Sequence, residues 1–225
     1  MFARHAIRSL GLASLLALGL VRPASAELML GLRFSEAGYT PYTVTSASDP
    51  LIVVQSFGNF TTNIEVNNVS TDPLSIDLGS LNLSAFGPGN LTVTASVTGL
   101  TAPLGSAGFL SQLSGNFSGA VDSVSLNTFL SNSDTMFGTD TQLTSLNATA
   151  GPFAMAGSAA GTTAASYGIT EVLNIQTSGV ASLSTDASVT AAPEIDARSG
   201  GAAIALLVGL VALLAERRRR PLSAA

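Results

Sequence analysis

The sequence contains no cysteine, no tryptophan and no lysine, and it has a single histidine. Without cysteine the chain can form neither disulfides nor thiolate metal sites, and it has no thiol nucleophile. The histidine, His5, lies in an N-terminal segment that we expect to be removed, so the exported protein would contain no imidazole. This excludes a Ser-His-Asp hydrolase and a histidine zinc site from the mature chain.

Positive charge is scarce outside the two ends of the chain. All nine cations are arginines, and Arg33 is the only one between Glu27 and Pro193. The body of the protein is therefore acidic. Nucleic-acid binding needs a basic surface that displaces counterions from phosphates, so we expect no nucleic-acid partner. An anionic polymer would be repelled unless a divalent cation bridged it to the protein.

Residues 1–26 have the organisation of a signal peptide. A positively charged start precedes an apolar run from Leu10 to Val21, and the segment ends in Ala24-Ser25-Ala26. The small side chains of Ala24 and Ala26 suit the pockets of signal peptidase, which predicts cleavage after Ala26. An uncleaved membrane anchor is the alternative, but the apolar run is short for a bilayer core of about 30 Å.

Residues 27–190 are expected to form one exported all-β domain, an antiparallel β-sandwich with little helix. Apolar and polar residues alternate most clearly in Asn90–Thr98 and Ala181–Thr190, which is typical of half-buried strands. Many short strands separated by turn signals indicate a sandwich. Weaker strand candidates are Leu28–Phe34, Tyr42–Thr45, Leu51–Val54, Thr61–Asn67, Leu74–Leu83, Val121–Leu130 and Ile169–Ile175.

Other parts of the body carry weaker signals. Pro88 and Gly89 are expected to lie in a turn before the strand at Asn90–Thr98, because proline has no amide hydrogen to donate to a neighbouring strand and glycine favours turns. Residues 109–117 have apolar residues at helical spacing, but their serines and glycines favour strand or loop. Residues 131–165 contain many Gly, Asn, Asp and Pro residues and are expected to be rich in loops.

Six Asn-x-Ser/Thr triplets occur in the body. A chain this rich in Asn, Ser and Thr produces such triplets by chance, so they indicate mainly that these positions are polar and exposed. The triplets begin at Asn59, Asn68, Asn82, Asn90, Asn116 and Asn147.

The C-terminal end has three consecutive parts. Residues 191–199 form a linker that contains Pro193-Glu194-Ile195-Asp196, residues 200–216 are expected to form a transmembrane helix, and residues 217–225 form a basic tail. The apolar run would span about 24 Å as a helix, slightly less than a bilayer core. By the positive-inside rule Arg217, Arg218, Arg219 and Arg220 act as a cytoplasmic stop, which places the body in the periplasm.

A Pro-Glu motif, a short apolar helix and a terminal arginine cluster, in this order over about residues 192–220, resemble the PEP-CTERM sorting signal of Gram-negative bacteria. Pro193-Glu194-Ile195-Asp196 is similar to the PEID variant of that signal. The resemblance implies an inner-membrane intermediate, processing by an exosortase-like sorting protease, and delivery to the cell surface or extracellular matrix. It also implies an association with exopolysaccharide and biofilm. A permanent C-terminal anchor of a periplasmic protein would have the same topology and is the alternative.

No enzyme activity, cofactor or metal is expected. A glycosidase needs only two carboxylates a few ångströms apart, but the acidic residues of the body are scattered and there is no tryptophan to stack on sugar rings. Asp134 and Asp140 lie in one predicted loop and offer oxygen ligands for calcium, although their spacing does not match an EF-hand. The acidic candidates are Glu36, Asp49, Glu65, Asp72, Asp77, Asp122, Asp134, Asp140, Glu171 and Asp186.

Together these observations favour a non-enzymatic, exported surface or matrix protein with a structural or adhesive role. A carbohydrate-binding module of the same fold is the leading alternative. That alternative would be supported by an exposed aromatic cluster on one sheet face, formed by Tyr39, Tyr42, Phe57 and Phe60.

Overall fold

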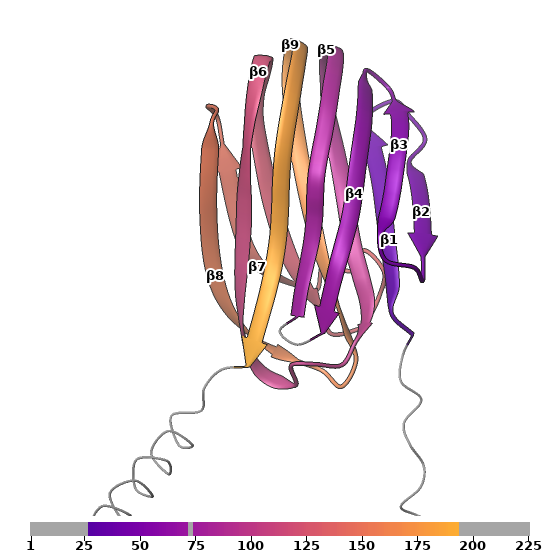
Figure 1. The fold of residues 1–225 in the computed structure, drawn as a ribbon, viewed down its shortest axis with the longest axis vertical. Coiled ribbons are helices and arrows are strands. Elements are labelled where there is room, and N and C mark those ends of the chain that lie inside the picture. The colour runs from indigo at the N-terminus through magenta and orange to yellow at the C-terminus, as the bar shows by residue number, and fades with distance from the viewer. Residues whose placement is uncertain (1–26, 72–73, 194–225) are drawn as a thin grey trace, which may run out of the picture.

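A computed structural model describes residues 27–71 and 74–193, and this part of the chain is all-β, as the sequence predicted. Nine strands form one antiparallel sheet (Figure 1). The described residues include no helix that is long and apolar enough to cross a membrane. The strands are β1 (Met29–Glu36), β2 (Tyr42–Ser46), β3 (Leu51–Phe57), β4 (Phe60–Thr71), β5 (Leu74–Leu100), β6 (Gly105–Ser131), β7 (Thr141–Ala148), β8 (Phe153–Thr163) and β9 (Tyr167–Pro193).

Three strands of 27 residues, β5, β6 and β9, run through both layers of this folded sheet. The first half of β5 pairs with β4 and the second half pairs with β1. In the same way, β6 pairs first with β8 and then with β7. The first layer therefore has the order β3-β4-β5-β9-β6-β8, and the second layer has the order β2-β1-β5-β9-β6-β7.

The core lies between the two layers. Alternate residues of each strand point inward, so that Leu83 and Leu183 of the first layer and Val93 and Leu173 of the second are all almost fully buried. Each such side chain contributes about 1.5–3 kcal/mol relative to an exposed position. A buried hydrogen bond of 2.9 Å between the hydroxyls of Ser111 in the first layer and Thr128 in the second crosses the interior.

The expectation of a turn at Pro88 and Gly89, before a strand at Asn90–Thr98, is wrong. Strand β5 continues through both residues, which pair with Ser178 and Thr177 of β9. This is the stretch in which β5 and β9 pass from one layer to the other. A proline without an amide hydrogen and a glycine without a side chain permit a bend here, so the turn signal marks a change of layer and not the end of a strand.

The expectation of only short strands and of a loop-rich segment at 131–165 also needs correction. That segment contains β7 and β8. Strand β8 consists largely of alanine, glycine and serine, which give no apolar alternation, so its sequence carries no period-two signal. The stretch at 109–117 belongs to β6, in agreement with the preference for strand or loop over helix.

The loop between β6 and β7 covers part of the outer face of the second layer. The amide of Phe137 donates a hydrogen bond of 3.1 Å to the Ser96 hydroxyl, and the Arg33 guanidinium lies 4.8 Å from the centre of the Phe137 ring. Met136 lies so close to Gly31 that a side chain at Gly31 would collide with its sulfur. The second layer is therefore partly shielded from solvent on its outside, and its polar groups face protein.

The bend of β6 gives a stability prediction. Gly119 has a φ of 81°, and a Cβ atom there would lie 2.5 Å from the Val180 carbonyl oxygen. Gly105 has a φ of 78° but no atom within 4 Å of such a Cβ. Gly105→Ala should lower the free energy of unfolding by about 1–2 kcal/mol, the cost of a left-handed backbone for an L-residue. Gly119→Ala should lower it by at least about 1 kcal/mol more, because the neighbouring backbone must move. Urea unfolding checks this, and equal losses would contradict it.

Candidate functional site

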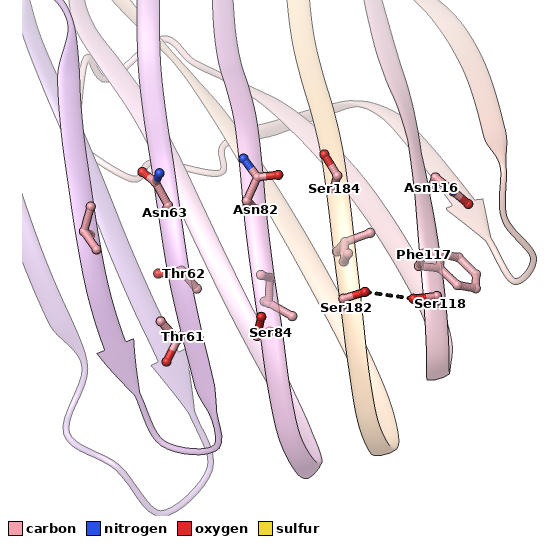
Figure 2. Close-up of a pocket in the computed structure, with 13 residues that line it drawn as sticks. Thr61, Thr62, Asn63, Asn82, Ser84, Asn116, Phe117, Ser118, Ser182 and Ser184 are labelled. Atoms are coloured by element: carbon pink, nitrogen blue, oxygen red, sulfur yellow. Dashed lines mark hydrogen bonds between the residues drawn. The ribbon is translucent and has the colours of Figure 1, made fainter.

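A hollow of about 530 Å³ lies on the outer face of the first layer. Side chains from β3, β4, β5, β9 and β6 line it (Figure 2). Its polar members belong to three residue types, asparagine, serine and threonine. They are Thr61, Thr62, Asn63, Asn82, Ser84, Asn116, Ser118, Ser182 and Ser184.

Strand register arranges the outward side chains of this hollow in two rows across four strands. Neighbouring strands lie about 4.8 Å apart, so each row offers a polar group at that interval. The row that we call the amide row consists of Asn63 on β4, Asn82 on β5, Ser184 on β9 and Asn116 on β6. The row beside it, the hydroxyl row, consists of Thr61, Ser84, Ser182 and Ser118 on the same strands.

The amide row is exposed and has free hydrogen-bonding capacity. Among the described residues, the side chains of Asn63, Asn82 and Asn116 have no hydrogen-bond partner. Each amide offers two donors and one acceptor oxygen. In the hydroxyl row, Ser118 and Ser182 hydrogen-bond to each other at 2.8 Å.

The outer face of the second layer differs, because most of its amides are already engaged. Thr92 donates to Asn174 at 2.8 Å, and the Gln142 side chain donates to Asn127 at 3.2 Å. The amide row of the first layer is therefore not a general consequence of the composition of this chain. It is a local arrangement in which the protein leaves its own donors and acceptors unused.

The hollow carries no ionisable side chain. Arg33 is the only cation in residues 27–193, and it lies on the second layer against Phe137. Glu65 and Asp186 lie two residues beyond Asn63 and Ser184 along their strands. The site can therefore offer neutral hydrogen-bonding groups, and it has no charge with which to bind an anion.

Three carboxylates that are far apart in the sequence meet beyond one end of the hollow. Asp77 on β5 hydrogen-bonds to Asp186 on β9, and Glu65 on β4 contributes negative charge. Burial of Asp77, followed by the hydrogen bond and charge of Asp186, raises the pKa of Asp77 from 3.8 to about 7. The Asp77 carboxyl therefore keeps its proton to a higher pH than an exposed aspartate does. The two carboxylates of a glycosidase stand about 5–9.5 Å apart, which leaves room for the sugar bond between them. The direct contact between Asp77 and Asp186 leaves no such room.

Glu171 lies beneath this acidic group, inside the sandwich-like core. It is 0% exposed, and neither carboxyl oxygen has a hydrogen-bond partner. In the strand register it stands between Ala95 and Thr128. Burial raises the pKa of Glu171 well above its usual range, and the negative charges of Asp77 and Asp186 add to this effect. The folded protein therefore holds the Glu171 proton at pH values at which an exposed glutamate has released it.

The calcium candidates Asp134 and Asp140 lie in the loop between β6 and β7, where their oxygens accept hydrogen bonds from the protein. Asp134 accepts from the Gly99 amide at 2.8 Å and from the Ser166 hydroxyl at 2.5 Å. Asp140 accepts from the Ser133 hydroxyl and amide, which lowers the pKa of Asp140. In residues 27–71 and 74–193 no group of three or more acidic or histidine side chains has the geometry to hold a metal ion. The two aspartates fix the loop.

The predicted aromatic cluster is not a flat exposed platform. Phe57 is 8% exposed and Phe60 is 1% exposed, because both point inward from their strands. Tyr39 and Tyr42 remain exposed, but Tyr39 packs against Phe57 with ring centroids 5.9 Å apart. The prediction that all four rings form a stacking surface for sugars is therefore wrong.

Sequence reasoning found part of the amide row. The Asn-x-Ser/Thr triplets placed Asn82 and Asn116 among exposed polar positions, and both are exposed. Asn63 belongs to no triplet, but the alternation of its strand places it opposite the buried Thr62 and Ile64. What no local pattern contains is the register that brings β4, β5, β9 and β6 into one row.

The predicted processing sites lie at the edge of the described structure or outside it. Strand β9 ends at Pro193, which pairs with Ala107 of β6. The remaining predicted residues lie outside the described part. They are Ala24 and Ala26 in segment 1–26, Glu194, Ile195 and Asp196, the helix at 200–216, and Arg217–Arg220.

Residues 192–221 match the VPEID-CTERM protein sorting domain. This is a PEP-CTERM-like, exosortase-type signal, and it confirms the PEID variant inferred from the motif. The matched range includes the motif that begins at Pro193 and the arginines 217–220. A search of curated proteins gives no match to the chain. The chain thus has the signal of an exported protein that exosortase-like machinery sorts.

Proposed function

We propose that this protein is a structural or adhesive component of the cell surface or extracellular matrix. The observation that carries the proposal is the junction at Pro193. The sorting domain begins at residue 192, and β9, which lies inside both layers of the sheet, ends at Pro193. Since only a short linker would follow, processing in it would release or transfer the folded body as one unit.

The proposal includes the path to the surface. The signal peptide at 1–26 directs export, and the helix at 200–216 with Arg217–Arg220 holds an intermediate in the inner membrane with the body in the periplasm. An exosortase-like protease then acts near Pro193-Glu194. The sorting match supports this path, and a permanent anchor is the alternative to its last step.

The proposal also assigns no catalysis to the body. Its support is chemical, because the exported chain would contain no imidazole and no thiol, and Asp77 and Asp186 lie in direct contact with no room for a sugar bond between them. An uncharged hydrogen-bonding face, in contrast, suits adhesion to polar material. The carbohydrate-binding alternative uses that same face and is developed below.

A body replacement tests the role. One strain lacking the protein receives the full chain, and a second receives a carrier in which an unrelated folded domain replaces residues 27–190 between the same leader and tail. The full chain should restore cell cohesion, measured as sedimentation of the culture, while the carrier should not. Surface labelling must show equal amounts of both. If the carrier restores cohesion equally, the body has no adhesive or structural role.

A further inference from the structure

The hollow on the first layer combines three properties in one place. It is recessed, with a volume of about 530 Å³. It presents the amide row, in which Asn63, Asn82 and Asn116 have no partner within the described structure. It has no charged lining residue. Elsewhere on the sheet, amide pairs such as Gln142–Asn127 are satisfied internally.

The chemistry of the row defines the ligand class. An amide donates and accepts at once, so a row of amides suits a ligand whose groups also do both. Hydroxyl groups have this property, whereas phosphate and carboxylate groups only accept. The acidic residues near the hollow, Glu65 and Asp186, disfavour anions further. The ligand should therefore be uncharged and rich in hydroxyl groups.

The geometry of the row defines the shape of the ligand. Four strands contribute polar groups about 4.8 Å apart along a line that crosses the strands. This interval is close to the advance of one sugar unit in an extended polysaccharide. At one end of the row Val54 of β3, 70% exposed, offers an apolar surface for the C–H face of a sugar ring.

We infer that this hollow binds an uncharged polysaccharide, which lies extended across β4, β5, β9 and β6. The amides of Asn63, Asn82 and Asn116 hydrogen-bond to successive sugar units, and the Ser184 hydroxyl completes the row. The inference rests on the proposed adhesive function, for which it names the ligand. It needs no aromatic platform, which distinguishes it from the cluster that the sequence suggested.

The test is native gel electrophoresis of the full chain in detergent, with a polysaccharide in the gel. The probes are dextran, hydroxyethyl cellulose and galactomannan, which are uncharged, and alginate, which is anionic. At least one uncharged probe should retard the protein, and alginate should not. The triple variant Asn63→Ala, Asn82→Ala, Asn116→Ala should bind at least about tenfold more weakly, because several hydrogen bonds are lost together.

The matched control is the double variant Ser145→Ala, Asn147→Ala, which removes an exposed hydroxyl and an exposed amide from β7 of the other layer. It should bind as the wild type does. Circular dichroism shows whether the triple variant folds. If it does not, Ser184→Lys replaces it as the deciding variant, because a long cationic side chain at this exposed position would occupy the row and abolish binding.

Four results would overturn the inference. The first three are no retardation by any of the uncharged probes, equal retardation by alginate, and a folded triple variant that binds as the wild type does. Retardation that depends on protein concentration without any probe would assign the face to a second copy of the chain, which also overturns it. Because the body replacement measures cohesion independently of any probe, the proposed function can survive when this inference fails.

Discussion

Replacing Pro193 and Glu194 with alanine is expected to hold the protein uncut in the inner membrane. Both residues lie before the apolar run, where a hydrophobic anchor is indifferent to them but a sorting protease is not. The wild type should appear in the surface or matrix fraction without Arg217–Arg220, while the variant keeps these arginines. Cell fractionation with mass spectrometry of the C-terminal peptide measures both properties, and the expected change is nearly complete.

The control must separate sorting from folding, because Pro193 pairs with Ala107 at the end of the sheet. Thr190→Ala changes β9 three residues earlier and leaves the motif intact, so this variant should be sorted normally. Replacing the four arginines with serine disturbs membrane retention with or without a protease and does not discriminate. If the alanine variant and the wild type both keep the arginines and fractionate alike, the tail is a plain anchor.

Glu171→Met is expected to stabilise the protein by about 1–4 kcal/mol at pH 7, because an apolar side chain of similar volume replaces a buried acid without partners. Glu171 is 0% exposed, and both of its carboxyl oxygens are unsatisfied. The melting temperature should rise by about 2–4 °C for each kcal/mol in a domain of this size. Calorimetry measures the change. A loss of stability would mean that the carboxyl group makes a favourable contact.

The same residue should make stability depend on pH, with a sign that follows from its raised pKa. The folded protein keeps the Glu171 proton at pH values where the unfolded chain has lost it. The contribution of Glu171 to the free energy of unfolding is therefore fully present in acid. It is lost by about 1.4 kcal/mol per pH unit as the pH rises from the usual glutamate range toward the pKa of Glu171 in the folded protein. Asp77, whose own pKa is raised, adds a loss between pH 3.8 and about 7.

Glu171→Gln should remove the part of this pH dependence that belongs to Glu171. The gain in stability of the variant over the wild type should therefore be larger at pH 8 than at pH 4. Asp122→Asn, which changes an exposed carboxylate on β6, is the control and should keep the wild-type profile. Urea unfolding between pH 4 and pH 8 checks both variants. A glutamine variant with the wild-type profile would assign the dependence to Asp77 alone.

The strand positions illustrate how far local sequence reaches. Alternation predicted Asn90–Thr98 and Ala181–Thr190 correctly, because a strand places successive side chains on opposite faces and one face must be apolar. It did not predict that these segments are halves of β5 and β9, since Pro88-Gly89 in β5 and Ser178-Gly179 in β9 resemble turns locally. It also missed β8, whose small side chains do not alternate in polarity.

The sequence by itself determined the all-β class, the acidic body with one cation, and the sorting signal, because each depends on composition or on the order of residues along the chain. Only the tertiary structure decided which of these residues meet. Register brings Asn63, Asn82 and Asn116 into one exposed row and Asp77 against Asp186, and the folding of the sheet buries Glu171 between its layers. Local alternation specifies the face on which a side chain lies, but pairing between strands far apart in the chain specifies its neighbours.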